Sequence, residues 1–589
     1  MFYYKINGKE IDRFNLNNLN NKIYYYNAGE IFEPTLTIQE IYHKVKDKKI
    51  NDFLGEYNYF FEDKDNIYII SDELGAIKWF YYKQDDVFVI SNNLWYMAHE
   101  LNLGIESINK DSFYESILFY FPLNNKTYFQ DINVVPQGSL VVFSKKNKTL
   151  HVEKIKHIKY KEKNLSKEEW FYCIDNAFKK NMDNIQKFNS NLYLGISISG
   201  GLDSRFSLLY TKHIKNKIGF LLGIRGKIFK PLDLISAQKL SNYFKIKLKL
   251  VNPFKNIDIK TKFLIDISRN PIGPSNFLKA IDKHKSFSKE EEFNVLLTGS
   301  YGGLVGGRIL NDDLINSNNE DLTFKMFYFY SEFTKLNEVK KGNAYFNFIK
   351  KSFYKLFLHL NLIDKKKIDF KKEIVDFLND NFLIPISYKE KLFNKFDKLF
   401  NKKLDNLSKI MTFHLYRHSI RGSFESLHGQ VKAYSIYYPY IFELSKQWNV
   451  EYLKGRTLIE EFIIYKDKEI SKIALQTFNL PKNINYNKYI KFLLKIISFI
   501  SFSLRGLVIT YNKWWKRKDV QKFVKQIMKE DVKVFNEIFN EKDIEHMMKY
   551  KRYDLLLEQI LKLKYILKVI ENKNYNELLN LKISESSKY

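Results

Sequence analysis

A chain of 589 residues is long enough for several domains, and its 45% hydrophobic content is that of an ordinary globular protein. The net charge of +29 comes from 96 basic and 67 acidic residues, but Lys, Asn and Ile are abundant along the whole chain, so we interpret it as a general compositional bias. No nucleic-acid-binding signature accompanies the charge, and we expect no nucleic-acid partner. The single cysteine, Cys173, excludes an intrachain disulfide and a cysteine-based metal site.

The chain up to about residue 155 is predicted to be β-rich. Three runs of β-branched and aromatic residues, separated by turn residues, predict strands at Asn66–Ser71, Val87–Ser91 and Leu140–Phe143. A polar stretch follows, in which Ser166 and Glu169 have the spacing of a capping box and predict the start of a helix.

Helices and strands are predicted to alternate from there to about residue 310. The strand candidates are Leu192–Ile198, Gly219–Ile224, Lys245–Val251 and Asn294–Gly299, and a helix is expected at Ala237–Phe244. This alternation predicts a parallel, doubly wound sheet, in which ligands bind at the carboxyl ends of the strands. Beyond about residue 320 the pattern is mostly helical.

The most distinctive motif is Ser-Gly-Gly-Leu-Asp-Ser at Ser199–Ser204, between the first of these strands and a helix. Glycines allow a tight turn that brings backbone N–H groups against a phosphate, and the helix N-terminus favours negative charge. Asp203 would repel a bare phosphate, so we expect it to bind a bridging Mg²⁺. The alternative interpretation is an ordinary glycine-containing turn between a strand and a helix.

This loop resembles the pyrophosphatase loop (PP-loop) of enzymes that cleave ATP to AMP and pyrophosphate. With the surrounding chain, over most of residues 50–480, it is similar to the synthetase domain of the asparagine synthetase family. The resemblance implies ATP and Mg²⁺ as cofactors, with Asp203 as the metal ligand. It also implies adenine contacts at Ile198 and Leu222, and a pair beside the nucleotide at Thr298–Gly299. The implied binding residues are Ile198, Ser199, Gly200, Gly201, Leu202, Asp203, Ser204, Leu222, Thr298 and Gly299.

The N-terminal part resembles a class II glutamine amidotransferase domain at Gly55–Asp63, Ser71–Lys78, Thr127–Ile132 and Val135–Gly138. That family uses an N-terminal cysteine as its nucleophile, activated by its own amine, but position 2 of this chain is Phe2. We therefore expect no glutamine hydrolysis. Similar domains without this chemistry occur in β-lactam synthetases, which close an amide ring instead of using ammonia.

The synthetase resemblance is broken at two further motifs. Thr298–Gly307 reads Thr-Gly-Ser-Tyr-Gly-Gly-Leu-Val-Gly-Gly, whereas the family has Ser-Gly-Glu-Gly-Ala-Asp-Glu-Leu-Phe-Gly-Gly, so the second Mg²⁺ carboxylate is missing. Tyr437–Phe442 looks like the family's Arg-x-Pro-Phe-Leu-Asp, with Phe442 in place of the Asp. Asp203 is left as the only matched metal ligand, with Asp312 or Asp313 as candidate substitutes for the missing carboxylate.

Several basic residues are candidates for anion binding. Arg417 and Arg421 are four residues apart and would share one helix face, where they hold either phosphate, an acidic substrate or only solvent. Lys454, Arg456 and Lys468 are weaker candidates for stabilising a pyrophosphate leaving group. The predicted catalytic residues are Asp203, Arg417, Arg421 and Lys468.

The resemblance implies an ATP-dependent amide-forming ligase. It would adenylate a small-molecule or peptide carboxylate and transfer the acyl group to an amine or to ammonia, without glutamine hydrolysis. The first alternative is a degenerate nucleotide-binding or scaffold protein that lacks catalysis. A second is a tRNA-modifying enzyme with the same loop, although the amidotransferase-like N-terminal part argues against it.

The expected fold class is α/β in three parts. A β-rich amidotransferase-like domain (1–155) would precede a doubly wound parallel-sheet PP-loop domain (166–480) and a helical C-terminal extension (485–589). The sequence indicates neither the oligomeric state nor the role of this extension.

One segment bears on localisation. Phe492–Tyr511 is strongly apolar but carries Lys495 and Arg505, and Trp514–Arg517 follows it. We favour a helical hairpin packed on the protein, with peripheral membrane contact through 492–517 as the alternative. Because the first residues do not have a signal-peptide pattern, we expect a cytoplasmic protein.

Overall fold

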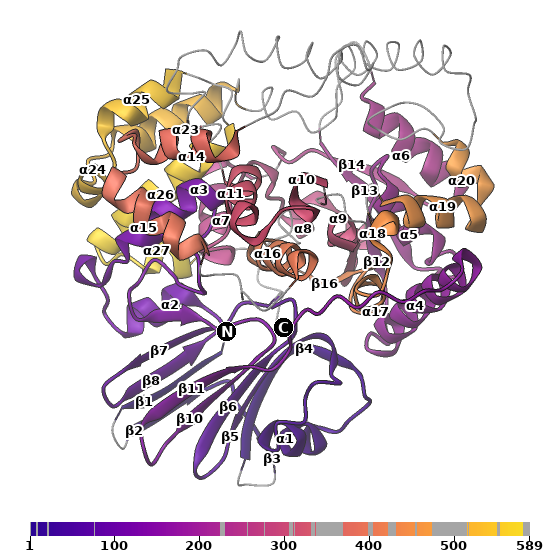
Figure 1. The fold of residues 1–589 in the computed structure, drawn as a ribbon, viewed down its shortest axis with the longest axis horizontal. Coiled ribbons are helices and arrows are strands. Elements are labelled where there is room, and N and C mark those ends of the chain that lie inside the picture. Colours follow the sequence, from indigo (N-terminus) through magenta and orange to yellow (C-terminus); the bar gives the residue numbers. More distant parts are fainter. Residues whose placement is uncertain are drawn as a thin grey trace.

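The computed structural model describes residues 2–7, 10–19, 23–75, 77–223, 230–255, 257–275, 277–305, 310, 312–331, 336, 369–397, 405–421, 431–453, 456–473, 515, 517–549 and 554–580. The fold is α/β, as predicted. In Figure 1 two antiparallel sheets lie at the bottom, the parallel sheet lies above them on the right, and the C-terminal helices lie on the left.

The N-terminal part is a sandwich of two antiparallel sheets. One sheet has the order β2(Glu10–Phe14), β1(Tyr3–Asn7), β8(Val87–Ser91), β7(Phe80–Gln84), β9(Ile132–Val134). The other has the order β11(Thr149–Lys154), β10(Ser139–Ser144), β6(Asn66–Ser71), β5(Leu54–Glu62), β4(Ile23–Glu33), β3(Asn17–Leu19). The predicted strands β6 and β8 have the expected bounds, and β10 is one residue longer at each end.

Apolar side chains fill the space between the two sheets, as alternation along the strands requires. Phe2, Phe60, Ile69, Phe88 and Val141 belong to this buried cluster. The outer face of the second sheet packs against α1(Ile38–Lys46), and α2(Leu94–Glu100) contacts β8 of the first sheet. The next elements along the chain are η1(Ile105–Ser107) and α3(Lys110–Phe119).

The second sheet system is parallel throughout. Its order is β14(Leu248–Val251), β13(Lys217–Leu222), β12(Leu194–Ser197), β15(Val295–Thr298), β16(Lys432–Ser435). The four predicted strands are β12 to β15, and the doubly wound arrangement is confirmed. The strand order reverses between β12 and β15, so the carboxyl ends of these two strands are the switch point of the sheet.

Helices flank this sheet. The capping box that the sequence predicts is present at the start of α4: Ser166 N–H donates to Glu169 Oε2 (2.8 Å), and Glu169 N–H donates to Ser166 Oγ (3.3 Å). The helices up to β15 are α4(Lys167–Lys187), α5(Leu202–Leu209), α6(Leu232–Tyr243), α7(Ile259–Arg269), η2(Phe277–Lys279), α8(Lys283–Ser286) and η3(Lys289–Glu291).

The rest of the described chain is helical except for β16, as expected. Between β15 and residue 473 the helices are α9(Gly302–Val305), α10(Asp312–Ile315), α11(Asn319–Tyr330), α14(Phe370–Leu378), α15(Ile386–Asp397), α16(Asn406–Arg421), α17(Tyr440–Ser445), α18(Val450–Leu453), α19(Thr457–Lys466) and α20(Lys468–Lys472). The C-terminal helices are α23(Lys518–Lys529), α24(Lys533–Ile538), α25(Glu541–Lys549), α26(Asp554–Glu571) and α27(Asn576–Leu579).

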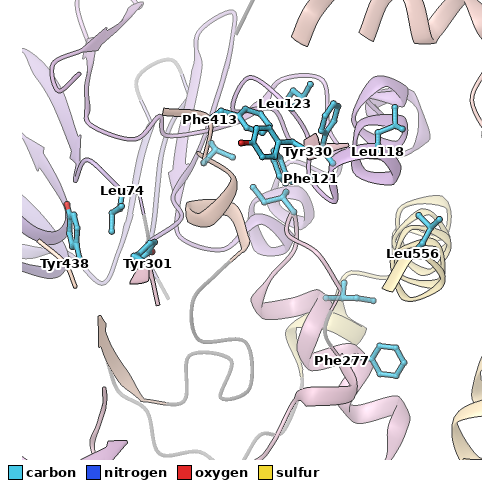
Figure 2. Packing of buried hydrophobic residues seen from close by; sticks show 14 of the residues in the cluster. Leu74, Leu118, Phe121, Leu123, Phe277, Tyr301, Tyr330, Phe413, Tyr438 and Leu556 are labelled. Atoms are coloured by element: carbon cyan, nitrogen blue, oxygen red, sulfur yellow. The ribbon is translucent and has the colours of Figure 1, made fainter. Parts of the chain in front are cut away.

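The C-terminal helices connect the sandwich to the parallel-sheet part. Tyr575 Oη donates to the Leu103 carbonyl in the sandwich (2.8 Å), and Lys562 Nζ donates to the Gly273 carbonyl that follows α7 (3.0 Å). One apolar cluster extends through all three parts of the chain. Figure 2 shows a portion of it that includes Leu74, Tyr301, Tyr438 and Leu556.

No helix within the described ranges is long and apolar enough to cross a membrane. Of the segment 492–517, only residues 515 and 517 are described, so the predicted membrane contact falls almost wholly outside the described residues. The division into 1–155, 166–480 and 485–589 stays a prediction.

Candidate functional site

The Ser199–Ser204 loop leaves the carboxyl end of β12 and leads into α5. Its turn is held by the two serine side chains. Ser199 N–H donates to Ser204 Oγ (2.9 Å), Gly201 N–H donates to Ser199 Oγ (3.1 Å), and Ser204 Oγ donates to the Ser197 carbonyl (3.3 Å). The hydroxyl groups of Ser199 and Ser204 therefore stabilise the loop by hydrogen bonds within the turn.

The N-terminus of α5 is open to an anion. Gly201 is the N-cap residue, and no side chain among the described residues caps the first turn. The first N–H groups of a helix have no partner within the helix, and the helix dipole adds partial positive charge there. Such a terminus favours a phosphate or carboxylate.

A second glycine-containing loop, after β15, lies directly against the first. A Cβ built on Gly299 would be 2.3 Å from Asp203 Cβ, and one built on Gly302 would be 2.2 Å from Asp203 Oδ1. Only glycine permits this approach. The predicted pair Thr298–Gly299 is thus placed beside the Ser199–Ser204 loop, at the switch point of the sheet.

The carboxylate of Asp203 has two partners from distant segments. Tyr437 Oη donates to Asp203 Oδ1 (2.9 Å), and Arg456 Nη2 forms an ion pair with the same oxygen. Arg456 Nη2 also lies 3.3 Å from Tyr437 Oη. We call Asp203, Tyr437 and Arg456 the Asp203 triad.

Electrostatics fixes the protonation of two members of this triad. Burial, and then the charge of Asp203, raises the pKa of Tyr437 well above its usual value, so its hydroxyl is a hydrogen-bond donor. Burial lowers the pKa of Arg456, but Asp203 and Tyr437 outweigh it and the net pKa is raised. The Asp203 carboxylate therefore faces a permanent guanidinium cation.

The donor set around Asp203 does not fit a Mg²⁺ ion held by the protein. Mg²⁺ binds one or two carboxylates along with water and phosphate oxygens, and here the only matched carboxylate is paired with Arg456. The described residues contain no group of three His, Cys, Asp or Glu side chains that could hold a metal.

The two predicted adenine-contacting residues lie at adjacent strands. Ile198 follows β12, is fully buried, and its N–H donates to the Phe220 carbonyl of β13 (2.8 Å). Its Cδ1 would be 2.3 Å from a Cβ on Gly219, so its side chain packs onto β13. Leu222 ends β13 and is also buried. An adenine contact at either residue stays a prediction.

Most of the other predicted basic side chains lie outside the described part of the chain. Arg417 and Arg421 lie on α16, but their side chains fall outside the described residues, as does Lys454. Lys468 begins α20 with an exposed side chain that makes no ion pair with a described residue. The predicted roles of these residues remain untested.

Sequence reasoning missed two residues that hold the loop. One is Tyr437, and the other is Arg205 on α5, which is 2% exposed. Arg205 Nη1 donates to the Ile470 carbonyl of α20 (2.5 Å), and Nη2 donates to the Gly200 carbonyl (3.4 Å). Burial lowers the pKa of Arg205 to about 10. The signal available in the sequence was an arginine placed among the apolar residues of a predicted buried helix.

The position of the expected amidotransferase nucleophile is filled by an aromatic cluster. Phe2 is fully buried and stacks on Tyr26, with ring centroids 4.6 Å apart and planes 5° apart. Phe60 and Trp79 each lie 5.2 Å from the Phe2 ring.

The buried carboxyl group of Glu56, on β5 of the sandwich, contacts the end of β16. Ser435 N–H, at the end of β16, donates to Glu56 Oε1 (3.4 Å), and Ser435 Oγ donates to the Ser300 carbonyl (2.5 Å). Tyr437 N–H donates to Ser435 Oγ (3.1 Å). Burial and the neighbouring Asp72 raise the pKa of Glu56 to about 8. Glu56 is thus separated from the Asp203 triad by a single residue, Ser435.

No family model matches the chain, and no curated protein matches its sequence. Among solved structures it is similar to glutamine phosphoribosylpyrophosphate amidotransferase from B. subtilis complexed with ADP and GMP (9% identity, TM-score 0.16, over 40% of this chain and 46% of that chain). A structure of the allosteric regulatory enzyme of purine biosynthesis gives 9% identity and a TM-score of 0.16, over 50% of this chain and 57% of that chain. The chain spans about half the length of these structures, and likenesses this weak carry no argument.

Proposed function

We propose that the chain is an ATP-dependent, AMP-forming amide ligase whose triphosphate binds at the Ser199–Ser204 loop. The observation that supports this most strongly is the junction of the uncapped N-terminus of α5 with the glycine loop after β15, at the switch point between β12 and β15. Open α/β sheets bind their ligands at this place. Arg456 adds a buried positive charge beside the same turn.

The proposed reaction has two steps. A carboxylate oxygen of the substrate attacks the α-phosphorus of ATP, an O–P bond forms, and the bond from that phosphorus to the pyrophosphate oxygen breaks. An amine then attacks the acyl carbon, AMP leaves with the former carboxylate oxygen, and the nitrogen loses a proton to solvent. Keeping the acyl-adenylate and the amine in one site makes the second step effectively intramolecular.

The residues of this chain would act mainly by binding and orientation. The N–H groups at the start of α5 and the guanidinium of Arg456 would stabilise the charge that builds up on the departing pyrophosphate. Arg205 would hold the loop in place through the Gly200 carbonyl. The aromatic packing around Phe2 supports an amine that comes from solution or from the substrate itself.

The test combines binding and turnover. ATP is titrated calorimetrically into the protein, and the protein is then incubated with ATP, a panel of amino acids, sugar acids and peptides, and ammonium or amine. We expect saturable ATP binding, and equimolar AMP and pyrophosphate that appear only with particular carboxylates. Formation of ADP, or the lack of any ATP binding, would rule out the proposed ligase.

A nucleotide-binding protein without catalysis is the second candidate. It is favoured by the pairing of Asp203 with Arg456 and by the missing second carboxylate after β15. ATP binding with no AMP from any member of the panel would support this candidate over the ligase.

A further inference from the structure

Arg456 is held in an unusual backbone conformation next to the loop. It is the N-cap residue of α19 with φ of 66°, the left-handed region that non-glycine residues rarely adopt. Such a conformation costs free energy and persists only where the surroundings impose it. Here it accompanies a side chain that is paired with Asp203 and is only 10% exposed.

The Nε atom of Arg456 is a buried donor without a hydrogen-bond partner in the described part of the structure. Arg456 Nη2 is engaged by Asp203 and Tyr437, whereas Nε is buried and has no hydrogen-bond partner among the described residues. A buried, unpaired N–H group is costly, and an anion at this place would satisfy it. Glu460 on α19 is the other acidic group whose charge acts on Arg456.

At this turn the negative charge of Asp203 is balanced by an arginine, whereas in a metal site it would be balanced by the cation. Alone, the negative Asp203 in the first turn of α5 would repel a phosphate. Arg456 neutralises that charge, so the partial positive charge of the uncapped helix N-terminus is left to attract an anion. Tyr437 holds the same carboxylate oxygen and fixes its direction.

We propose that Arg456 takes the charge-neutralising place of a protein-bound divalent cation, so that the phosphates of ATP bind at this loop without a metal ligated by Asp203. The inference deepens the proposed function and rests on it, because both place the triphosphate at the N-terminus of α5. The inference differs in the role of Asp203, which pairs with Arg456 and does not bind a metal ion.

The first test measures ATP and inorganic pyrophosphate binding by calorimetry, once with excess EDTA and once with saturating Mg²⁺. Because Asp203 is paired with Arg456 and no group of three metal-binding side chains occurs in the described part of the chain, we expect the two dissociation constants to agree within about threefold. Loss of one charge-assisted contact would change them by more than that.

Three variants separate the two accounts. Loss of the guanidinium in Arg456→Ala should weaken binding in EDTA about 10- to 100-fold, and Arg456→Lys should restore part of it, since it keeps the charge. Asp203→Asn removes the negative charge that is paired with Arg456, so the guanidinium becomes available to the phosphates. ATP should therefore bind in EDTA as tightly as to the wild type, or more tightly. Thermal unfolding curves check that each variant is folded.

The outcomes are distinct. If wild-type binding requires Mg²⁺ and Asp203→Asn abolishes it, the metal-free site is wrong while the proposed ATP site stands. If Arg456→Lys and Arg456→Ala both bind like the wild type, Arg456 has no part in phosphate binding. If neither probe binds in either condition, the proposed function fails and this inference fails with it.

Discussion

Gly302 and Gly303 are adjacent residues with opposite surroundings, and they provide a matched pair of variants. An alanine Cβ at Gly302 would be 2.2 Å from Asp203 Oδ1 and 2.7 Å from Tyr437 Cε2, whereas at Gly303 it meets nothing within 4 Å. We expect Gly302→Ala to displace the Asp203 triad at a cost of about 1–3 kcal/mol and to weaken ATP binding about tenfold.

The control for this variant is the neighbouring position. Gly303→Ala should bind ATP like the wild type and be unchanged or more stable by about 0.5–1 kcal/mol, since alanine is the better helix former. Calorimetric titration and thermal unfolding measure both effects. Equal ATP affinity in the two variants would show that the loop after β15 does not position the nucleotide site.

Phe2 is expected to be a packing residue. Because its ring is fully buried among aromatic side chains, Phe2→Ala should destabilise the protein by about 3–5 kcal/mol. Phe14 on β2 is 44% exposed, and Phe14→Ala should change stability by no more than about 0.5 kcal/mol. Urea unfolding followed by tryptophan fluorescence compares them, and similar midpoints would contradict the assigned role of Phe2.

The sequence predicts the loop residues well and their partners poorly. The motif Ser199–Ser204 is continuous, so its position after a strand and before a helix can be inferred from local pattern alone. Asp203 is separated in the sequence from its partners Tyr437 and Arg456 by 234 and 253 positions. Only the folded chain brings these side chains together, and a motif comparison that expects carboxylates does not suggest an arginine.

At the scale of elements, β5 and β16 meet at a carboxyl group that titrates near neutral pH. Glu56 has its pKa raised to about 8, mainly by burial. The unfolded chain releases this proton near pH 4.5, while the folded protein keeps it until about pH 8. The folded state therefore binds more protons in this window, and stability falls as the pH rises through it.

The substitution Glu56→Gln removes this titration and keeps the shape of the side chain. Relative to the wild type, the variant should gain stability progressively from about pH 4.5 to 8, by about 3–5 kcal/mol in total. Urea unfolding at closely spaced pH values measures the gain. Glu153 on β11, partly exposed and paired with Lys48, provides a control, since Glu153→Gln should show no such gain. A pH-independent difference at Glu56 would contradict its buried, protonated state.

Periodicity was sufficient for β6, β8 and β10 of the sandwich and for four strands of the parallel sheet, and the other sandwich strands and β16 were not predicted. The strands β6, β8, β12, β13 and β15 are apolar runs bounded by turn residues, a pattern that marks buried strands, whereas β14 has alternating polar and apolar residues. β16 is a four-residue strand in a helical region, and its pairing with β15 begins at Val295 opposite Lys432. Tertiary pairing rather than local propensity makes this segment a strand, so the sequence gives no sign of it.

At the scale of the whole molecule, the C-terminal helices attach the sandwich to the parallel-sheet part. Lys562 on α26 has no exposed side-chain surface, donates to the Gly273 carbonyl, and lies 3.6 Å from the buried carboxylate of Asp266 on α7. We expect Lys562→Met to destabilise the protein by about 3–5 kcal/mol, because it leaves the Asp266 charge buried without its cation.

A second lysine of the same helix provides the control. Lys568 pairs with Glu530 at 3.1 Å, with side chains that are 32% and 27% exposed. Partly exposed pairs contribute little, so Lys568→Met should cost at most about 1 kcal/mol. Adding Asp266→Asn to Lys562→Met should recover part of the loss. Thermal unfolding measures both losses of stability. Equal losses at Lys562 and Lys568 would contradict the role of the buried Lys562–Asp266 pair in attaching α26 to the parallel-sheet part.

The central claim of this account is that a triphosphate binds where α5 begins. It is tested most directly by a structure of the protein with α,β-methylene-ATP, in which the bond to the leaving pyrophosphate cannot be cleaved. We predict the phosphates against the backbone N–H groups of Gly200–Asp203, with Arg456 in contact with them. Phosphates bound elsewhere in the molecule, or no bound nucleotide at saturating concentration, would contradict the account.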